Sequence, residues 1–338
     1  MYNISLITGD GIGPELSESA VSVLEMIHDK LGVKTKIHLV EAGDIALKKY
    51  MKALPDETFE SIKSSDACLK APVGESAADV IVVLRRELDL YANIRPAKSY
   101  PNTPSLRNDI DLVIVRENTE DLYTGQEFTV DDSAIALRVI SEKASKRIAN
   151  HAFKTAIQRN QKKRVTCVHK SNVMRKTDGL FAKSCESVAK KFPGVKFDQM
   201  YVDACSMNLI RQPQEFDVIV TTNLFGDILS DESSQVVGGL GMAPAANLGD
   251  NFGLFEPVHG AAFDIAGKQI ANPTSFILSI KMMLEWLGNK NNDQNSISAS
   301  QKLENIVLQV IESGMATKDV GGNMSTREFT KEITNRLV

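Results

Sequence analysis

The chain contains little of what marks several classes of protein. Only four of its 338 residues are cysteine, and these are scattered without a C-x-x-C pair. This spacing predicts reduced, mostly buried thiols in a cytoplasmic protein rather than a disulfide framework. The sequence has no basic run and its net charge is −4, so we expect no nucleic-acid partner. No apolar run approaches the length of a membrane span and no secretory leader is evident, so we expect no membrane partner.

What is present is an alternation of apolar strand and helix patterns. The expected strands are 4–8, 33–40, 67–70, 112–116, 164–169 and 217–221, with a further short strand ending near residue 201. The expected helices are one that starts near Pro14 and ends near Gly32, and 56–64, 77–88, 142–158, 179–191, 272–287 and 301–313. This alternation predicts an α/β fold, and the length favours two domains. The Asn- and Ser-rich stretch 288–298 is expected to be an exposed loop.

The first glycine-rich turn tempts a Rossmann assignment that its spacing does not support. Residues 9–13 read Gly-x-Gly-x-Gly, and Pro14 follows directly. The dinucleotide fingerprint requires G-x-G-x-x-G, with an acidic residue about 20 positions later. Taken alone, the segment therefore predicts only a tight turn between a strand and a helix.

Asp227 and Asp231 are the most informative pair of residues. They lie four positions apart where a helix is expected to begin after strand 217–221, and this spacing places them on one helix face. Two carboxylates at this distance repel each other unless a cation lies between them. Their hard oxygen ligands suit Mg²⁺ or Mn²⁺. An isolated pair would also be typical of a solvated helix start, so the residues found elsewhere in the chain decide.

Further charged and aromatic residues follow helices and strands along the chain. They are Arg85, Arg95, Arg116, Tyr123, Lys170, Asn172 and Asp203. Loops at the carboxyl ends of strands are where open α/β sheets place their sites. Each residue also has an ordinary structural explanation, such as a surface cation or a packed ring, so only the combination indicates chemistry.

The segments that contain these residues resemble those of the β-decarboxylating dehydrogenases, and so do residues 256–268 and 272–274. This family includes isopropylmalate, isocitrate, homoisocitrate and tartrate dehydrogenases. The resemblance runs from Gly9 to Gly322 and includes the 9–15 turn. It implies a two-domain α/β fold that is not Rossmann, with a bent sheet shared by both domains and the site in the cleft. Residues 1–99 and 239–338 would form the cofactor-side domain. Residues 100–238 would form the central domain and the interface of a homodimer, with higher oligomers left open.

The resemblance also implies how a malate-like substrate and a metal are held. Guanidinium groups bind carboxylates through paired hydrogen bonds. The positions that match the substrate-binding arginines of the family are Arg85, Arg95 and Arg116. Those that match its Mg²⁺ or Mn²⁺ ligands are Asp203, Asp227 and Asp231.

Proton transfer falls to two further residues by the same resemblance. Lys170 matches the base that takes the hydroxyl proton, and Tyr123 matches the acid that reprotonates the product carbon. Asn172 matches a position that touches the substrate or the nicotinamide. The resemblance further implies that Lys170 and Asp203 come from the second subunit, so that each site spans a dimer.

The cofactor is expected to be NAD. The family's adenosine-binding loop matches His259, Gly260, Ala262, Asp264, Ile265 and Asn272. A carboxylate at Asp264 accepts hydrogen bonds from ribose hydroxyls and repels the 2′-phosphate of NADP. In the absence of the surrounding motif, His259 would be interpreted as a packed loop residue.

The residues before Arg85 favour 3-isopropylmalate, the precursor in leucine biosynthesis, as the substrate. Ile81 and Val82 match positions that face its variable arm, where an isopropyl group gains transfer energy and an unpaired carboxylate is penalised. Both are also explained by simple helix packing. A glutamate that many isopropylmalate enzymes carry seven positions before the arginine is Ala78 here, and Glu75 or Asp79 is left as a candidate substitute. Homoisocitrate, isocitrate and a broad specificity remain alternatives.

Two other functions are weighed against catalysis. A regulatory subunit of a hetero-oligomeric isocitrate dehydrogenase would share the fold, but such subunits tend to lose a catalytic or metal residue. Here Tyr123, Lys170 and all three aspartates are present, which favours an enzyme. A plain nucleotide-binding module would not explain the arginines and aspartates together.

Overall fold

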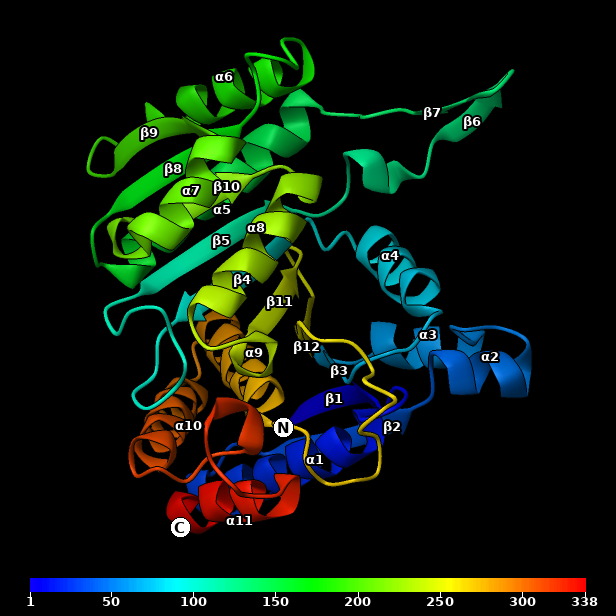
Figure 1. Ribbon diagram of the computed structural model, residues 1–338. Coiled ribbons are helices and arrows are strands. Elements are labelled where there is room, and N and C mark those ends of the chain that lie inside the picture. Colours follow the sequence, from blue (N-terminus) through cyan, green and yellow to red (C-terminus); the bar gives the residue numbers. More distant parts are fainter.

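A ten-stranded mixed sheet forms the centre of the computed structural model, which describes all 338 residues (Figure 1). Its order is β2-β1-β3-β12-β11-β4-β5-β10-β8-β9. The strands are β1 (Tyr2–Ile7), β2 (Thr35–Val40), β3 (Ala67–Lys70), β4 (Ala92–Lys98), β5 (Asp111–Glu117), β8 (Arg164–His169), β9 (Lys196–Tyr201), β10 (Val218–Thr221), β11 (Pro244–Leu248) and β12 (Gly253–Pro257). Antiparallel pairing is confined to β12-β11-β4-β5, and the flanking strands are parallel. The expectation of an α/β fold that is not Rossmann is confirmed.

Helices cover both faces of this sheet. They are α1 (Gly13–Leu31), α2 (Asp44–Tyr50), α3 (Asp56–Lys63), α4 (Ala77–Glu87), α5 (Glu142–Arg159), α6 (Thr177–Ala189), α7 (Val202–Arg211), α8 (Asn223–Val236), α9 (Thr274–Asn291), α10 (Gln294–Glu312) and α11 (Thr326–Leu337). The main core cluster contains 52 buried residues, and it joins strands of both halves of the sheet to α1, α5, α9 and α10. No helix combines the length and the apolarity that crossing a bilayer requires.

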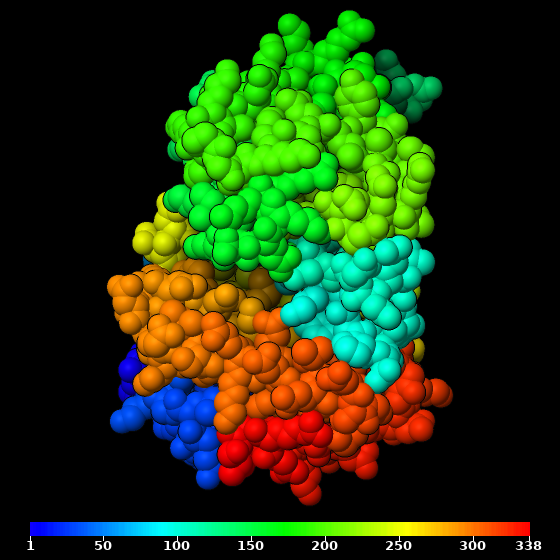
Figure 2. Space-filling view, turned by 90° about the vertical axis from the view of Figure 1, so that its left-hand side faces the viewer, coloured from blue at the N-terminus to red at the C-terminus, as the bar shows by residue number.

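The strand order separates the chain into two groups. Six neighbouring strands, from β2 to β4, belong to residues 1–99 and 239–338, and the other four belong to residues 100–238. Both chain ends lie together in the lower half of the molecule, and the green middle segment forms the upper half (Figures 1 and 2). The groups meet at the seven-residue antiparallel pair of β4 and β5. We propose that the domain boundary lies between these two strands.

Several expected elements agree with the structure, and one prediction is wrong. Strands 67–70 and 164–169 are confirmed, and α1 carries Pro14 in its first turn and ends before Gly32, whose φ is 70°. Stretch 288–298 is not an exposed loop. The chain reverses within a single left-handed residue, Asn292, and the side chain of Asp293 accepts hydrogen bonds from the first backbone N–H groups of α10. The polar residues at this turn are helix caps, a role for which Asn and Asp are equally suited.

A hairpin extends away from the body of the molecule. Its strands are β6 (Glu127–Val130) and β7 (Ser133–Ala136), which pair only with each other, and all eight strand residues are exposed (Figure 1). Among them are apolar side chains such as Phe128 and Ile135. A solvent-exposed two-stranded hairpin is marginally stable alone, so this segment is suited to contact with another chain.

Candidate active site

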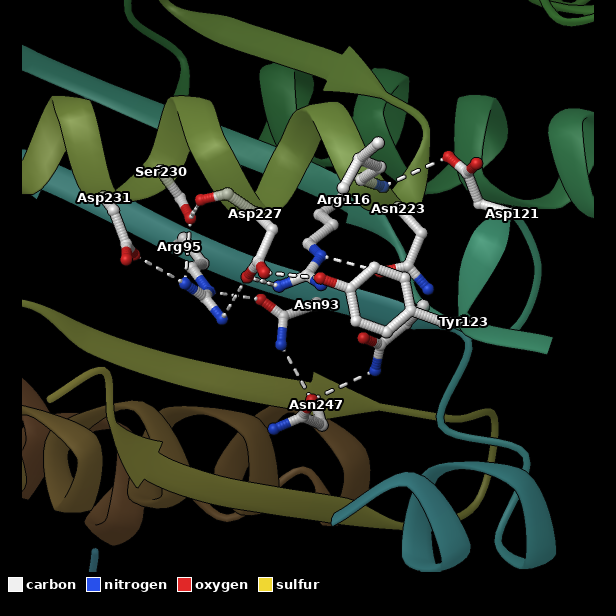
Figure 3. A network of polar contacts seen from close by, with 12 residues as sticks. Asn93, Arg95, Arg116, Asp121, Tyr123, Asn223, Asp227, Ser230, Asp231 and Asn247 are labelled. Atoms are coloured by element: carbon white, nitrogen blue, oxygen red, sulfur yellow. Dashed lines mark hydrogen bonds and ion pairs between the residues drawn. The ribbon is translucent and has the colours of Figure 1, made fainter. Parts of the chain in front are cut away.

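Asp227 and Asp231 lie on one face of α8, as their spacing predicted, but in its second and third turns rather than at its start, because the helix already begins at Asn223. Arg95 of β4 reaches both, with one guanidinium nitrogen 3.2 Å from an oxygen of Asp231 and another 3.6 Å from an oxygen of Asp227 (Figure 3). The aspartate side chains are about half exposed, whereas that of Arg95 is only 10% exposed. The two carboxylates therefore form an acidic, solvent-accessible surface, and the largely buried guanidinium of Arg95 lies beneath it.

Arg116 supplies a second, deeper cation beneath Asp227. It is the penultimate residue of β5, lies opposite Thr221 of β10, is 1% exposed, and forms an ion pair with Asp227. Its Nε also donates to Oδ1 of Asn223 at 2.9 Å. A Cβ atom at Gly226 would lie 2.4 Å from the Arg116 side chain, so only glycine allows α8 to pass this close.

The pKa values of the two aspartates are shifted in opposite directions. Burial alone would raise the pKa of Asp227, but Arg116, Tyr123 and Arg95 together lower it. The pKa of Asp231 is raised, chiefly by burial, although Arg95 opposes the shift. Asp227 is thus held as an anion, which is the form that binds a divalent cation.

Tyr123 lies directly beside this anion. It sits in a short 3₁₀ turn (Leu122–Thr124), and its hydroxyl donates to Oδ2 of Asp227 at 2.5 Å. The Arg116 guanidinium lies 5.1 Å from the ring centroid. Burial, and then the hydrogen bond to Asp227, raise the pKa of Tyr123. At neutral pH the residue is therefore a protonated donor aimed into the site, as a general acid must be.

Arg85 is anchored in a buried polar cluster that sequence reasoning missed. Its Nε donates to Asn247 at 3.0 Å, and Glu256 lies 3.6 Å from its guanidinium. Glu256 is also 2.7 Å from Lys70. Burial alone would raise the pKa of Glu256, but Lys70 and Arg85 hold it at about 2. An acidic residue in the 256–268 motif and a lysine at the end of the 67–70 strand were the available sequence signals.

This ion pair predicts a specific acid sensitivity. Because the pKa of Glu256 in the folded protein, about 2, lies below its ordinary value of 4.5, its contribution to stability is present above pH 4.5 and is lost as the pH falls toward 2. We expect the stability difference between wild type and Glu256→Gln to change by about 3 kcal/mol between pH 6 and pH 2. Urea unfolding across this pH range measures it. Glu18→Gln, which removes an exposed ion pair with Arg327, should show no such change.

Lys170 and Asp203 lie next to each other, on different elements from the one that carries Asp227 and Asp231. Lys170 follows β8, Asp203 is in the first turn of α7, and the lysine amine is 2.6 Å from the carboxylate. Asn172 is exposed in the same loop as Lys170. The chain contains no cluster of three acidic, histidine or cysteine residues that would hold a metal ion. Asp227 and Asp231 are therefore not joined by Asp203 within one chain.

Arg138 links buried side chains that hold several site segments in place, and no sequence pattern indicated this role. It forms ion pairs with two fully buried carboxylates, Asp121 and Asp178, and donates to the N-cap Thr222 of α8 at 2.8 Å. Asp178 in turn accepts from the backbone N–H of Lys170 at 2.5 Å. The Tyr123 turn, the start of α8 and the Lys170 loop are thus fixed by one network.

Five of the six expected adenosine residues line a single cavity of about 390 Å³. Its lining comprises Ile12, Gly241, His259, Gly260, Ala262, Ile265, Ile270, Ala271, Asn272 and Asp319. Asp264 is exposed and does not line it. Burial lowers the pKa of His259, whose buried Nε2 has no hydrogen-bond partner. A neutral ring with a free buried nitrogen fits a polar ligand group, because such atoms are rarely left unpaired.

The glycine-rich 9–15 turn supports this cavity. Gly11 has a φ of 57°, and a Cβ atom there would lie 2.0 Å from the carbonyl oxygen of Ala261. The backbone N–H of Ile12 donates to the same oxygen at 2.8 Å, and its side chain lines the cavity. Packing against the 259–264 loop explains Gly11, whereas Cβ atoms at Gly9 and Gly13 would collide with the carbonyl oxygens of Pro72 and Thr8. The close approach of backbone thus explains the glycines without a phosphate.

Comparison with known proteins now identifies the family. Residues 3–335 match the isocitrate/isopropylmalate dehydrogenase family. The chain belongs to this family. A 3-isopropylmalate dehydrogenase of Saccharolobus solfataricus is 52% identical over 334 residues, which cover 98% of each chain. An isocitrate/homoisocitrate dehydrogenase of Thermus thermophilus is 47% identical over 342 residues, which cover 99% of this chain and 98% of the other. The crystal structure of an isocitrate dehydrogenase from Methylococcus capsulatus superposes with a TM-score of 0.93 at 42% identity, covering 100% and 99% of the two chains.

The chain is thus a β-decarboxylating dehydrogenase, as the sequence motifs predicted. Enzymes of this family use NAD or NADP together with a divalent metal ion. The donor set fits such an ion, since Asp227 is an accessible anion and Asp231 lies on the same helix face.

Ile81 and Val82, the two residues of α4 predicted to face the substrate, pack differently in this dehydrogenase. Ile81 packs against the small core cluster that contains Val80 and Leu84, whereas Val82 contacts no core cluster. Val82 and Ile81 lie three and four positions before Arg85, so both share its helix face, and only their packing distinguishes them. Asp79 lines a separate groove with residues of α2 and α3. Val82 is thus the better placed of the two for a ligand held by Arg85.

Proposed function

We propose that the chain converts 3-isopropylmalate to 4-methyl-2-oxopentanoate and CO₂ in leucine biosynthesis, with NAD and Mg²⁺ or Mn²⁺. The observation that carries this proposal is that Arg85, one of three buried arginines suited to binding carboxylates, shares a helix face with the apolar side chain of Val82. The other cation of α4, Arg86, is 73% exposed and pairs with Glu87. The 52% identity to a 3-isopropylmalate dehydrogenase over nearly the full length supports the same substrate.

The arginines bind the two carboxylates of the substrate. Arg85, Arg95 and Arg116 are all largely buried, so their guanidinium groups are oriented before the ligand arrives. A preoriented fork loses less entropy on binding than a flexible cation. The apolar arm of the substrate then lies toward Val82, where its burial is favourable.

The metal would be held by Asp227 and Asp231 of one subunit and by Asp203 of a second copy of the chain. When bound, the ion supplies positive charge that stabilises the oxyanion developing at the substrate. Asp227 forms an ion pair with Arg116 and accepts from Tyr123, so its carboxylate is fixed at the site.

Two side chains move protons. Lys170 takes the hydroxyl proton of the substrate as hydride leaves the same carbon, and bound NAD supplies the acceptor for that hydride. After CO₂ leaves, Tyr123 donates its hydroxyl proton to the neighbouring carbon. The raised pKa of Tyr123 keeps that proton available at neutral pH. Asn172, in the Lys170 loop, would contact the substrate or the nicotinamide.

The active form would be a homodimer. Within one chain, Lys170 forms an ion pair with Asp203, whereas Asp227 forms its ion pair with Arg116. The exposed β6–β7 hairpin and its apolar side chains give the second copy a surface to bind. Each site would then combine Asp227 of one subunit with Lys170 of the other.

NAD would occupy the cavity beside His259. Asp264, which lies between the lining residues Ala262 and Ile265 in the sequence, would accept from the ribose hydroxyls. We expect Asp264→Asn to raise kcat/KM for NADP by about tenfold or more, because a charge that repels the 2′-phosphate is removed. Initial rates with each cofactor measure this ratio. Glu25→Gln, which removes one exposed charge elsewhere, should leave the ratio unchanged. Equal responses of both variants would contradict the assignment of Asp264.

Initial rates of NADH formation with Mg²⁺ on 3-isopropylmalate, homoisocitrate and isocitrate test the proposal. We expect 3-isopropylmalate to lead by more than about tenfold in kcat/KM, a difference of about 1.4 kcal/mol. A lead by either tricarboxylate would mean that an unidentified cation enters the pocket near Val82. Similar rates on all three would indicate a broad specificity, and no turnover on any would favour a regulatory subunit.

A further inference from the structure

Asn247 lies at the centre of the sheet, beneath the substrate arginines. It is fully buried in β11, where it pairs in register with Asn93 of β4. Asn93 in turn pairs with Arg116 of β5. Residues directly opposite each other in antiparallel strands point to the same face of a sheet. Three neighbouring strands therefore place Asn247, Asn93 and Arg116 in one row across the floor of the site (Figure 3).

The side-chain amide of Asn247 makes four hydrogen bonds. Its oxygen accepts from Nε of Arg85 at 3.0 Å and from the side-chain amides of Asn93 at 2.7 Å and Asn118 at 3.0 Å. Its nitrogen donates to Oε1 of Glu256 at 2.7 Å. Since donors face one end and a carboxylate faces the other, the amide has a single favourable orientation.

Asn247 is connected to a second arginine through Asn93. The side-chain oxygen of Asn93 accepts from Nε of Arg95 at 2.8 Å. The Nε atoms of Arg85 and Arg95, which come from different elements, are thus held by two amides in direct contact. Bidentate binding of a carboxylate requires an aligned guanidinium plane, and holding Nε fixes that plane.

We propose that Asn247 is a positioning residue for the substrate carboxylates, which orients Arg85 directly and Arg95 through Asn93. This inference rests on the proposed function of both arginines. It assigns no chemical step to Asn247 itself. Asn247 would act by keeping the guanidinium groups of Arg85 and Arg95 in place. A misplacement of about 1 Å in a group that positions the substrate can lower the rate by about 100-fold.

Asn247→Ala removes the shared acceptor and should loosen both arginines. We expect the Kd of 3-isopropylmalate with Mg²⁺, measured by isothermal titration calorimetry, to rise about 10- to 100-fold. The KM for the diacid should rise in parallel, while the KM for NAD changes less than about twofold, because the His259 cavity is separate. Loss of stability alone would lower the amount of active enzyme and leave both constants unchanged. Thr330→Val removes a buried hydroxyl that bonds to Ser19, and it should lower Tm without affecting either constant.

A paired exchange tests the orientation of the amide. Asn247→Asp keeps an acceptor for the three donors but places a second carboxylate against Glu256, so we expect weak diacid binding. Adding Glu256→Gln restores a donor between the two side chains at unchanged net charge. The double variant should bind the diacid within about threefold of wild type, a coupling that a double-mutant cycle isolates.

The outcomes separate this inference from the proposed function. The positioning role would be overturned if Asn247→Ala is folded and keeps the wild-type Kd and KM for the diacid. It would also be overturned if the double variant binds the diacid no more tightly than Asn247→Asp does. If wild type binds 3-isopropylmalate without oxidising it, the proposed function fails and the Kd ratio still decides the role of Asn247. If wild type binds none of the three diacids, both fail, because Arg85 and Arg95 then hold no carboxylate.

Discussion

Lys170→Met is expected to lower kcat about 10²- to 10⁴-fold, the usual contribution of a general base. Its amine is the only lysine nitrogen proposed to meet the substrate hydroxyl, and methionine removes it while keeping an unbranched side chain. Asp227→Asn is expected to be inactive as well, because the anion that Arg116 holds for the metal is lost. Steady-state rates of the two purified variants measure both effects.

Mixing these two inactive variants should restore activity. In a mixed dimer one site combines an intact Asp227 from one subunit with an intact Lys170 from the other. Random association gives about half mixed dimers with one good site each, so about one quarter of wild-type activity is expected. Co-expression of the two variants, each with a different tag, produces the mixed dimers and allows them to be identified.

A matched mixture provides the control. Lys170 and Asp203 lie 2.6 Å apart and are proposed to enter the same neighbouring site. Lys170→Met mixed with Asp203→Asn therefore places a defect in every site and should regain no activity. If the first mixture also stays inactive while mixed dimers are shown to form, each site is built from one chain and the shared-site proposal is wrong.

The parts of the site that the sequence predicted are those set by local rules. Asp227 and Asp231 share a face because α8 begins at the end of a buried strand, and four positions make about one helical turn. The same holds for Arg116, which lies near the end of its strand, opposite Thr221. Such relations depend on spacing within one or two elements, and spacing is visible in the sequence.

The parts that were missed depend on distant contacts. Asn247 has no local signal, because its four side-chain hydrogen-bond partners lie on four other segments of the chain. Helix α2 is only seven residues long, and its first N–H groups are satisfied by Asp10, which lies 34 and 35 positions away. The β6–β7 hairpin is exposed on both faces and so lacks the alternation that marks a half-buried strand.

Tyr123→Phe is expected to reduce kcat about 10²- to 10⁴-fold by a different route from that of Lys170. The variant lacks the hydroxyl that donates to Asp227 at 2.5 Å but keeps the ring against Arg116. If Tyr123 acts only after CO₂ leaves, hydride transfer precedes its step. A single turnover should then still produce NADH in a rapid burst, while the steady-state rate and the uptake of solvent deuterium into the product both fall.

Tyr91→Phe is the matched control for this substitution. Its hydroxyl bonds to Asp250 at 3.3 Å, outside the arginine and aspartate cluster, so its loss should leave both the burst and the steady state unchanged. A Tyr123→Phe enzyme that loses the burst as well would place Tyr123 at or before hydride transfer. That result would contradict its assignment as the acid for the carbon, because the Asp227 contact would then serve the first proton transfer or the binding of the metal.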